Sequence, residues 1–366
     1  MINKKIILFI PSIEGGGVEK NLFSISNHFV KQFKEVVLIT SGKKYKKKFH
    51  KIKIISPFIN IEELESRSLK YLLCLFQLFL YLLFNGQKSL VFSFQANIYA
   101  IIIAKILSKK IVVRANSSPS GWSFNKIKFF IFRKIYQLSD GIIVNSDHFK
   151  KEFDKVFKVD STCIYNPLNI NEAKKFSKKS APKIYNKKNS LKLLNIGRMV
   201  DQKDQITILK ALKFIKEKYK FHNFELVIIG RGKLEYNLKK FIKHHILENQ
   251  IKILPFKKNP YPYFKQADIF ILSSKFEGLP NVMLEAAVFK KFIISSDCPT
   301  GPKEILKNGK FGSLFKIGDY KKLGSLIFEN RKKNYTIKTN LCYKNLKKYN
   351  FQKNLNKYYK FIKSLN

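Results

Sequence analysis

The chain has 366 residues, of which 71 are basic and 25 are acidic, so its formal net charge is +46. Hydrophobic residues make up 45% of the sequence, which is enough to form real cores and excludes wholesale disorder. The length exceeds that of one ordinary domain and suits two.

The excess of positive charge has three interpretations. A nucleic acid or an anionic membrane surface would attract such a protein. Only six of the 71 basic residues are arginine, whereas proteins that read bases use arginine for bidentate contacts, so we expect no nucleic-acid partner. Between the two remaining interpretations, an anionic membrane surface and a compositional bias toward lysine, the sequence does not decide.

The four cysteines are widely separated and show neither a Cys-x-x-Cys pair nor metal-ligand spacing. This pattern is typical of reduced thiols, and we expect a cytoplasmic protein. The first residues are charged and then apolar, but the apolar run is short and reaches Pro11. We therefore expect a first parallel strand there and not a secretory signal.

Short β-branched apolar runs alternate with helical periodicity along the whole chain. Such runs lack polar alternation, as strands of parallel sheets covered on both faces do, so the pattern predicts an α/β, doubly wound fold. The expected strands are residues 6–10, 36–40, 52–56, 90–94, 111–115 and 142–145, and then 191–196, 226–229, 251–254, 269–272 and 292–295.

The alternation breaks between residues 173 and 190, which contain few core-forming residues and are expected to be a linker. We therefore expect an N-terminal Rossmann-like domain over 1–172 and a C-terminal one over 191–345. The lysine-rich end, 346–366, is expected to form a helix that can pack back on the N-terminal domain.

Residues 71–84 form an apolar run that only Gln77 interrupts. At about 1.5 Å per residue, a helix of this length is too short to span a bilayer. The run fits a fully buried helix or a helix lying at a membrane interface among lysines, and both interpretations stay open.

Three glycines, Gly15 to Gly17, lie between the first expected strand and the next helix. Glycines at this place allow a tight turn and bring backbone N–H groups close to an anion at the helix N-terminus. The spacing is not that of a dinucleotide fingerprint, and a merely tight turn would look the same.

Arg198 and Lys203 flank the turn that leaves the first strand of the second domain. This is the carboxyl edge of the sheet, where open α/β sheets bind ligands. A guanidinium and an ammonium there suit a diphosphate, although solvated basic residues are common in this chain.

Two carboxylates, Glu277 and Glu285, lie on either side of a loop and a helix N-terminus within residues 273–286. One can reach a sugar hydroxyl and the other a ribose, while the amides of 278–280 face phosphates. Acids in such positions also simply complement a helix dipole. Downstream, Gly301-Pro302 starts a further helix, with Glu304 in its first turn.

In order along the chain, these motifs are Gly-Gly-Gly-Val-Glu-Lys, Asn166-Pro167, Gly-Arg-Met-Val-Asp-Gln-Lys-Asp, Phe-Glu-Gly-Leu-Pro-Asn-Val-Met-Leu-Glu-Ala and Asp-Cys-Pro-Thr-Gly-Pro-Lys-Glu-Ile-Leu. Together they resemble the retaining glycosyltransferases of family 4, of the bacterial surface-polysaccharide or lipopolysaccharide type. The resemblance implies the GT-B fold, in which two Rossmann-like domains face each other across a cleft, the N-terminal one on the acceptor side and the C-terminal one binding the nucleotide sugar.

The resemblance also implies roles for particular residues. Arg198 and Lys203 would hold the donor diphosphate, Glu277 the transferred sugar and Glu285 the ribose, with Arg198, Lys203 and Glu277 forming the catalytic set. The remaining donor-binding positions would be Gly278, Leu279, Pro280, Asn281 and, from the opposite domain, Gly16 and Gly17. Many relatives have a histidine near the sugar where this chain has Asn116.

The sequence contains no Asp-x-Asp motif, so we expect neither a metal nor another cofactor. The resemblance implies front-face transfer with retention, from a donor that is expected to be UDP-linked to a lipid-linked or polysaccharide acceptor. We expect the enzyme to lie at the inner face of the cytoplasmic membrane. Two alternatives are a basic nucleic-acid-binding protein and a UDP-sugar epimerase of the same fold.

Overall fold

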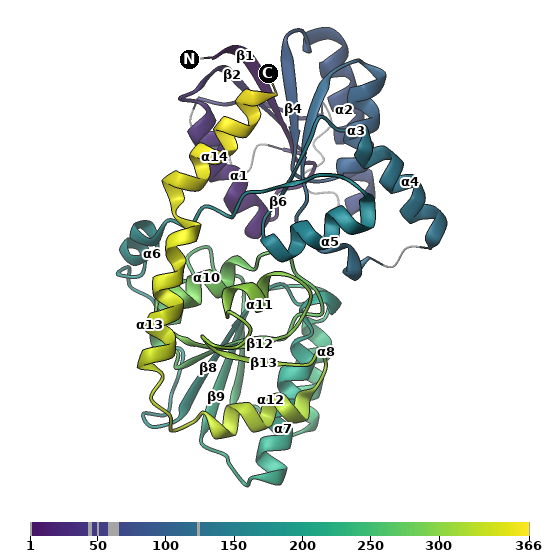
Figure 1. Ribbon diagram of the computed structural model, residues 1–366. Helices are drawn as coiled ribbons and strands as arrows, with labels where there is room; N and C mark the ends of the chain where they lie inside the picture. The colour runs from purple at the N-terminus through teal and green to yellow at the C-terminus, as the bar shows by residue number, and fades with distance from the viewer. Residues whose placement is uncertain (1, 43–45, 50, 58–65, 123–124, 366) are drawn as a thin grey trace. The chain divides into compact units, whose positions relative to one another are not determined.

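The computed structural model describes residues 2–42, 46–49, 51–57, 66–122 and 125–365. It divides into two compact units, Met1–Pro167 with Phe351–Asn366, and Leu168–Asn350. Each unit contains one wholly parallel sheet with helices on both faces (Figure 1). The predicted α/β class with two doubly wound domains is therefore confirmed.

The sheet of the first unit has seven strands in the order β3-β2-β1-β4-β5-β6-β7. Every expected strand of this half is present. The strands are β1 (Ile2–Phe9), β2 (Phe33–Ile39), β3 (Lys53–Ile55), β4 (Ser89–Ser93), β5 (Lys110–Arg114), β6 (Gly141–Val144) and β7 (Thr162–Cys163). The sequence did not predict β7, because two residues are too few to show a pattern.

Alternate residues of β1 enter two different cores, one on each face of this sheet. Ile6 and Leu8 pack with α1 (Gly17–Phe29) and α14 (Phe351–Ser364). Ile7 and Phe9 pack on the other face, in the core that the remaining helices cover. Those helices are α2 (Arg67–Asn85), α3 (Asn97–Ile106), α4 (Lys126–Gln137) and α5 (Asp147–Phe157).

The C-terminal helix α14 belongs to the first unit, although the whole second unit, Leu168–Asn350, separates it in sequence from the rest of the first unit. It lies beside α1 (Figure 1), and Leu355, Tyr358 and Ile362 are buried in the shared core. The helix begins at residue 351, where the chain returns from the second unit to the first, and not at the expected residue 346.

The sheet of the second unit has six strands in the order β10-β9-β8-β11-β12-β13. The strands are β8 (Leu191–Ile196), β9 (Phe224–Ile229), β10 (Ile251–Leu254), β11 (Ile269–Leu272), β12 (Phe292–Ser296) and β13 (Ser313–Phe315). The helices are α6 (Ile170–Phe176), α7 (Gln205–Lys218), α8 (Glu235–His244), α9 (Tyr261–Gln266), α10 (Asn281–Val288), α11 (Gly301–Ile305), α12 (Tyr320–Glu329) and α13 (Thr336–Asn345).

The segment expected to be a linker, 173–190, is instead part of the second unit. Tyr185 is buried, and its hydroxyl donates to the Leu193 carbonyl at 2.8 Å. Glu225 accepts hydrogen bonds from the backbone N–H groups of Asn186 and Lys187 at 2.7 and 2.9 Å. The polar composition of the segment did not reveal these long-range hydrogen bonds, which hold it against β8 and β9.

The apolar run 71–84 lies in α2 and has two different faces. Leu78 and Leu82 are fully buried against the sheet, whereas Leu72 and Phe76 on the opposite face are 64% and 59% exposed. In the described part of the chain, Ser68–Asn85 is the one stretch of helix long and apolar enough to cross a membrane. Its buried face makes it part of the helical layer of the first unit.

Candidate active site

The candidate site lies at the switch point of the second sheet. Strands β8 and β11 are neighbours in the sheet, but β8 is followed in sequence by β9 on its other side, and β11 by β12 on its other side. The connections that leave the carboxyl ends of β8 and β11 therefore run in opposite directions, which creates a crevice between these two strands. The two loops concerned are 197–204, after β8, and 273–280, after β11. They carry the predicted residues Arg198, Lys203 and Glu277.

Lys203 and Glu277 form an ion pair across this crevice. Lys203 Nζ lies 2.5 Å from Glu277 Oε1, and the two side chains are 17% and 9% exposed. The Ser274 hydroxyl donates to the same carboxylate oxygen at 2.7 Å. Both of these contacts of the Glu277 carboxylate are made by Oε1.

Further hydrogen bonds join the two loops and fix the position of this pair. The Ser273 hydroxyl donates to the Lys203 carbonyl at 2.9 Å. Gln202 Nε2 donates to the Phe276 carbonyl at 2.9 Å, and the Lys275 N–H donates to the Gln202 carbonyl at 2.8 Å. The cation and the carboxylate are therefore preorganised, as binding and catalytic groups require.

Thr300, a residue with a strained backbone, holds the loop of Glu277 by hydrogen bonds. Thr300 has a φ of +80°, which is rare for a β-branched residue, and its hydroxyl donates to the carbonyls of Glu277 and Gly278 at 2.8 and 2.9 Å. A Cβ on Gly301 would lie 2.2 Å from the Gly278 carbonyl oxygen, so only glycine fits there. Sequence reasoning identified Gly301 only as a helix start and missed Thr300.

Arg198 and Glu285 occupy different environments at the same edge. Arg198 is exposed, and its carbonyl accepts a hydrogen bond from Gln205 Nε2 at 2.9 Å. Glu285 is buried in the second turn of α10. The N-cap of α10, Pro280, makes no side-chain capping hydrogen bond, and the helix dipole gives this end partial positive charge.

The glycine turn of the first unit is already occupied by a carboxylate. Gly16 is the N-cap of α1 and Gly17 its first residue, and both are exposed. The Glu19 side chain folds back over the turn, where its Oε1 accepts a hydrogen bond from the Glu14 N–H at 3.3 Å. A phosphate at this helix N-terminus would compete with that carboxylate.

Asn116 is held by a buried arginine that sequence reasoning did not single out. Arg114 is fully buried and donates to Asn116 Oδ1, to Asn166 Oδ1 at 2.5 Å and to the Tyr358 hydroxyl at 3.0 Å. Asn116 Nδ2 donates to the carbonyls of Phe94 and Arg114. The Asn116 amide is therefore fixed, with both N–H donors engaged within the first unit. The scarcity of arginine in this chain was the one available signal.

The cysteine closest to this pair of loops is poorly suited to act as a nucleophile. All four cysteines are free, and burial raises the pKa of the Cys298 thiol to about 12, which disfavours the nucleophilic thiolate. Within the described ranges, no three or more His, Cys, Asp or Glu side chains gather into a metal-binding group.

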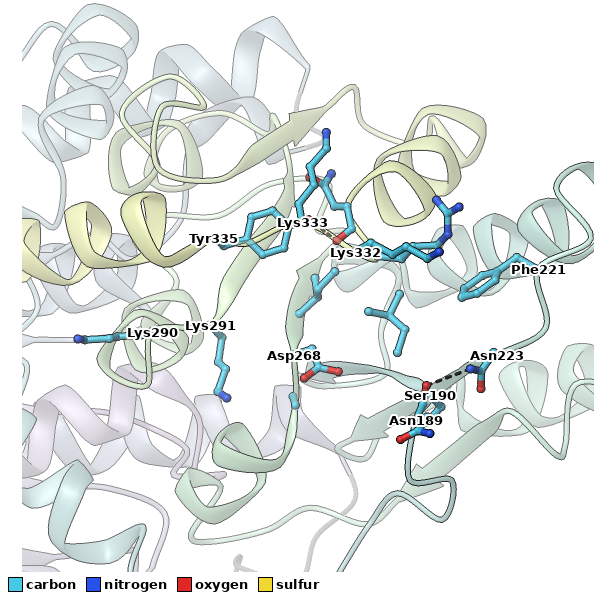
Figure 2. A pocket seen from close by; sticks show the side chains of 15 residues that line it. Asn189, Ser190, Phe221, Asn223, Asp268, Lys290, Lys291, Lys332, Lys333 and Tyr335 are labelled. Atoms are coloured by element: carbon cyan, nitrogen blue, oxygen red, sulfur yellow. Dashed lines mark hydrogen bonds between the residues drawn. The ribbon is translucent and has the colours of Figure 1, made fainter.

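A separate cavity of about 570 Å³ opens at the opposite, amino edge of the second sheet (Figure 2). Asp268, Lys290 and Lys291 lie beside the strand starts that line it. None of the predicted site residues lines this cavity. The candidate active site is at the carboxyl edge and not at this cavity. Lys203 and Glu277 converge at the carboxyl edge, and ligands of open α/β sheets bind at carboxyl strand ends.

Comparisons with known proteins identify the family and the fold. Residues 15–172 match the family described as Glycosyltransferase Family 4, and residues 177–341 match that described as Glycosyl transferases group 1. The fold resembles crystal structures of Anabaena HepE in complex with UDP (17% identity, TM-score 0.75, 99% of this chain and 100% of that chain) and of a Rickettsia africae glycosyltransferase (16% identity, TM-score 0.75, 100% and 99%). A two-domain GT-B fold with a switch-point site thus defines the class.

The two matches together cover most of the chain, which therefore belongs to glycosyltransferase family 4. An uncharacterised glycosyltransferase of Methanocaldococcus jannaschii is 34% identical over 50% of this chain and 46% of its own length. An α-1,4-N-acetylgalactosaminyltransferase of Campylobacter jejuni, which acts on an undecaprenol-diphosphate-linked glycan, is 26% identical over 86% of this chain and 85% of its own. A second transferase of that species aligns over 60% of its length, so two of these relatives are matched over less than two thirds of their length.

Proposed function

We propose that this protein transfers a sugar from a nucleoside-diphosphate sugar, UDP-linked, to a lipid-linked or polysaccharide acceptor in cell-surface glycan biosynthesis. The observation that carries the proposal is the Lys203–Glu277 pair at the switch point of the second sheet. The Campylobacter relatives named for undecaprenol-linked acceptors and the UDP complexes of similar fold support the same donor and acceptor classes.

The donor would lie along the carboxyl edge of the second sheet. Lys203 and Arg198 provide positive charge for the diphosphate, and the N-terminus of α10 adds its dipole. Glu277 Oε2 accepts a hydrogen bond from a hydroxyl of the transferred sugar. Glu285 meets the ribose, while Gly278, Leu279 and Pro280 border the phosphates through their backbone.

Transfer would proceed at one face of the sugar with retention of anomeric configuration. The bond between the anomeric carbon and the phosphate oxygen breaks, and the acceptor hydroxyl oxygen bonds to the same face of that carbon. The hydroxyl proton passes to the departing phosphate oxygen. Lys203 and Arg198 stabilise the negative charge that develops on the diphosphate, so the charge needs no divalent metal.

A lipid-linked acceptor would require the enzyme to work at a membrane. A lipid-linked acceptor is confined to a bilayer, and we infer that the protein is peripheral on the inner face of the cytoplasmic membrane, with no nucleic-acid partner. Asn116 would lie near the sugar or the acceptor, with its amide held by Arg114 and by the Phe94 carbonyl.

Binding of nucleotide sugars tests this function directly. UDP- and GDP-sugars should raise the melting temperature of the wild-type protein, and one of them should do so most strongly. The same sugar should stabilise Lys203→Ala much less. Lys213→Ala is the matched control, because Lys213 forms an exposed ion pair with Glu217 on α7. A wild-type protein that no nucleotide sugar stabilises would refute the proposal.

A further inference from the structure

Exposed large apolar side chains gather on one part of the first unit. Among the described residues, twelve of the nineteen such side chains lie on α2, α3 and α4 or at the C-cap of α4, so they are not scattered singly over the surface. The twelve residues, called here the α2–α4 face, are Leu69, Leu72, Phe76, Leu83, Phe84, Tyr99, Ile102, Ile106, Ile127, Phe130, Ile131 and Leu138.

On each helix these side chains form a stripe opposite the buried stripe. Tyr99, Ile102 and Ile106 of α3 recur at helical spacing, while Ile101 and Ala104 of the same helix are fully buried. The three helices are neighbours on the same side of the sheet, with α3 between α2 and α4 (Figure 1). The stripes therefore lie next to one another and form one surface.

The charges of these three helices have a single sign. Their sequences contain no Asp or Glu, whereas α4 carries exposed Lys126, Lys128 and Lys134. Lys134 Nζ lies 5.8 Å from the Phe130 ring centroid, so a cation adjoins an exposed aromatic side chain. An apolar surface bordered by lysines complements an anionic lipid surface, with acyl chains below and phosphates at their edge.

We propose that the α2–α4 face docks the protein on an anionic lipid bilayer, with the exposed stripes of all three helices in the interface and the lysines of α4 among the headgroups. Helix α2 does not cross the bilayer in this arrangement, because Cys74, Leu78 and Leu82 on its other side are buried against the sheet. The inference rests on the proposed use of a membrane-confined acceptor, and it names the surface that meets the membrane.

Sedimentation with lipid vesicles tests the inference. The wild-type protein should bind vesicles of mixed phosphatidylglycerol and phosphatidylcholine, and a part of this binding should persist in about 0.5 M NaCl, because salt does not screen hydrophobic burial. The combined variant Leu72→Ser, Phe76→Ser and Phe130→Ser should lose the persistent part, a fall in partitioning on the order of a hundredfold. Lys126→Gln, Lys128→Gln and Lys134→Gln together should lose mainly the salt-sensitive part.

Matched controls separate this surface from general stickiness and charge. Tyr236, Ile246 and Ile337 in the second unit are at least as exposed as the three apolar targets, and their replacement by Ser should leave vesicle binding unchanged. Replacement of exposed Lys240, Lys243 and Lys333 by Gln serves the same purpose for charge. The melting temperature of every variant should stay near that of the wild type, because all these side chains face solvent.

Three outcomes would overturn the inference. The first is equal loss of binding in the target and control variants, and the second is wild-type protein that ignores anionic vesicles at low salt. The third is a wild-type protein that binds no vesicles and is a dimer in light scattering, while the apolar variant is a monomer. A second copy of the chain would then cover the α2–α4 face. Calorimetry with UDP keeps the proposed function separate, because the donor site lies in the other unit and should bind UDP equally in all variants.

Discussion

Lys203 Nζ lies 2.5 Å from Glu277 Oε1, although 74 positions separate the two residues along the chain. The contact exists because β8 and β11 are adjacent in the sheet, which brings the loops after them together. A buried ion pair of this kind contributes little net stability compared with apolar packing. The position of this pair at a switch point suits a binding site in which a ligand phosphate competes with Glu277 for the Lys203 ammonium.

Removal of the ammonium should weaken donor binding. Lys203→Ala should lower the affinity for UDP by about 1.5–3 kcal/mol, because a charge-assisted phosphate contact is lost. Isothermal titration calorimetry measures this directly, with Lys213→Ala as the control of unchanged affinity. UDP binding by Lys203→Ala that equals wild-type binding would place the diphosphate elsewhere.

A side chain at position 301 should distort the Glu277 loop. The Cβ of Gly301→Ala would lie 2.2 Å from the Gly278 carbonyl oxygen, so the loop must shift, and we expect a loss of stability of roughly 2–4 kcal/mol together with weaker UDP binding. Gly309→Ala is the comparison, because a Cβ there meets nothing within 4 Å and costs only backbone strain at φ +87°, about 1 kcal/mol. Equal stability losses in the two variants would contradict the steric argument.

The buried guanidinium of Arg114 should stabilise the first unit through the C-terminal helix. Tyr358→Phe removes the hydrogen bonds of its hydroxyl with Arg114 Nε and with the Ile164 carbonyl and should cost about 1–3 kcal/mol. Arg114→Met also removes the donors to Asn166 Oδ1 and Asn116 Oδ1 and should cost more. A double-mutant cycle in urea measures the coupling between Arg114 and Tyr358. Strict additivity of the two losses would show that this hydrogen bond contributes nothing.

Glu225 should make stability depend on pH in the acid range. Burial alone would raise the pKa of this carboxyl, but hydrogen bonds from Ser190 Oγ and the N–H groups of Asn186 and Lys187 favour the carboxylate more, so its pKa is lowered from 4.5. A lowered folded pKa contributes stability that is present above the unfolded value and is lost as the pH falls through the folded value.

The Glu225→Gln variant should therefore be less stable than the wild type by about 1–3 kcal/mol at neutral pH. The difference in unfolding free energy should shrink as the pH falls below 4.5, where the wild-type carboxylate itself becomes protonated. Urea unfolding between neutral and acid pH measures it, with exposed Glu248→Gln as the control. A difference that does not change with pH would mean that the charge of Glu225 contributes nothing.

Transfer should continue without divalent metal and should retain the anomeric configuration. Full activity in EDTA is expected, because Lys203 and Arg198 provide the positive charge that the leaving diphosphate requires. NMR of the product should show an α-linkage from an α-linked donor. Abolition of transfer by EDTA with recovery in Mn²⁺ would reject metal independence, and an inverted linkage would reject front-face transfer.

The sequence by itself determined the α/β class and nearly all the strands, because buried parallel strands appear as short apolar runs whose pattern is local. It also predicted that Lys203 and Glu277 follow strand ends, since each follows its own apolar run. Tertiary structure alone decided that these two side chains meet, because strand order is a long-range property.

The same distinction explains what the sequence left undetermined. Residues 173–190 have a polar composition typical of a linker, yet hydrogen bonds to Glu225 and burial of Tyr185 attach them to the second unit. In the run 71–84, every position except Gln77 is apolar, so the periodicity did not show which face points inward. Packing against the sheet selected Leu78 and Leu82 for the core and left Leu72 and Phe76 exposed, because a helix on a sheet buries only one side.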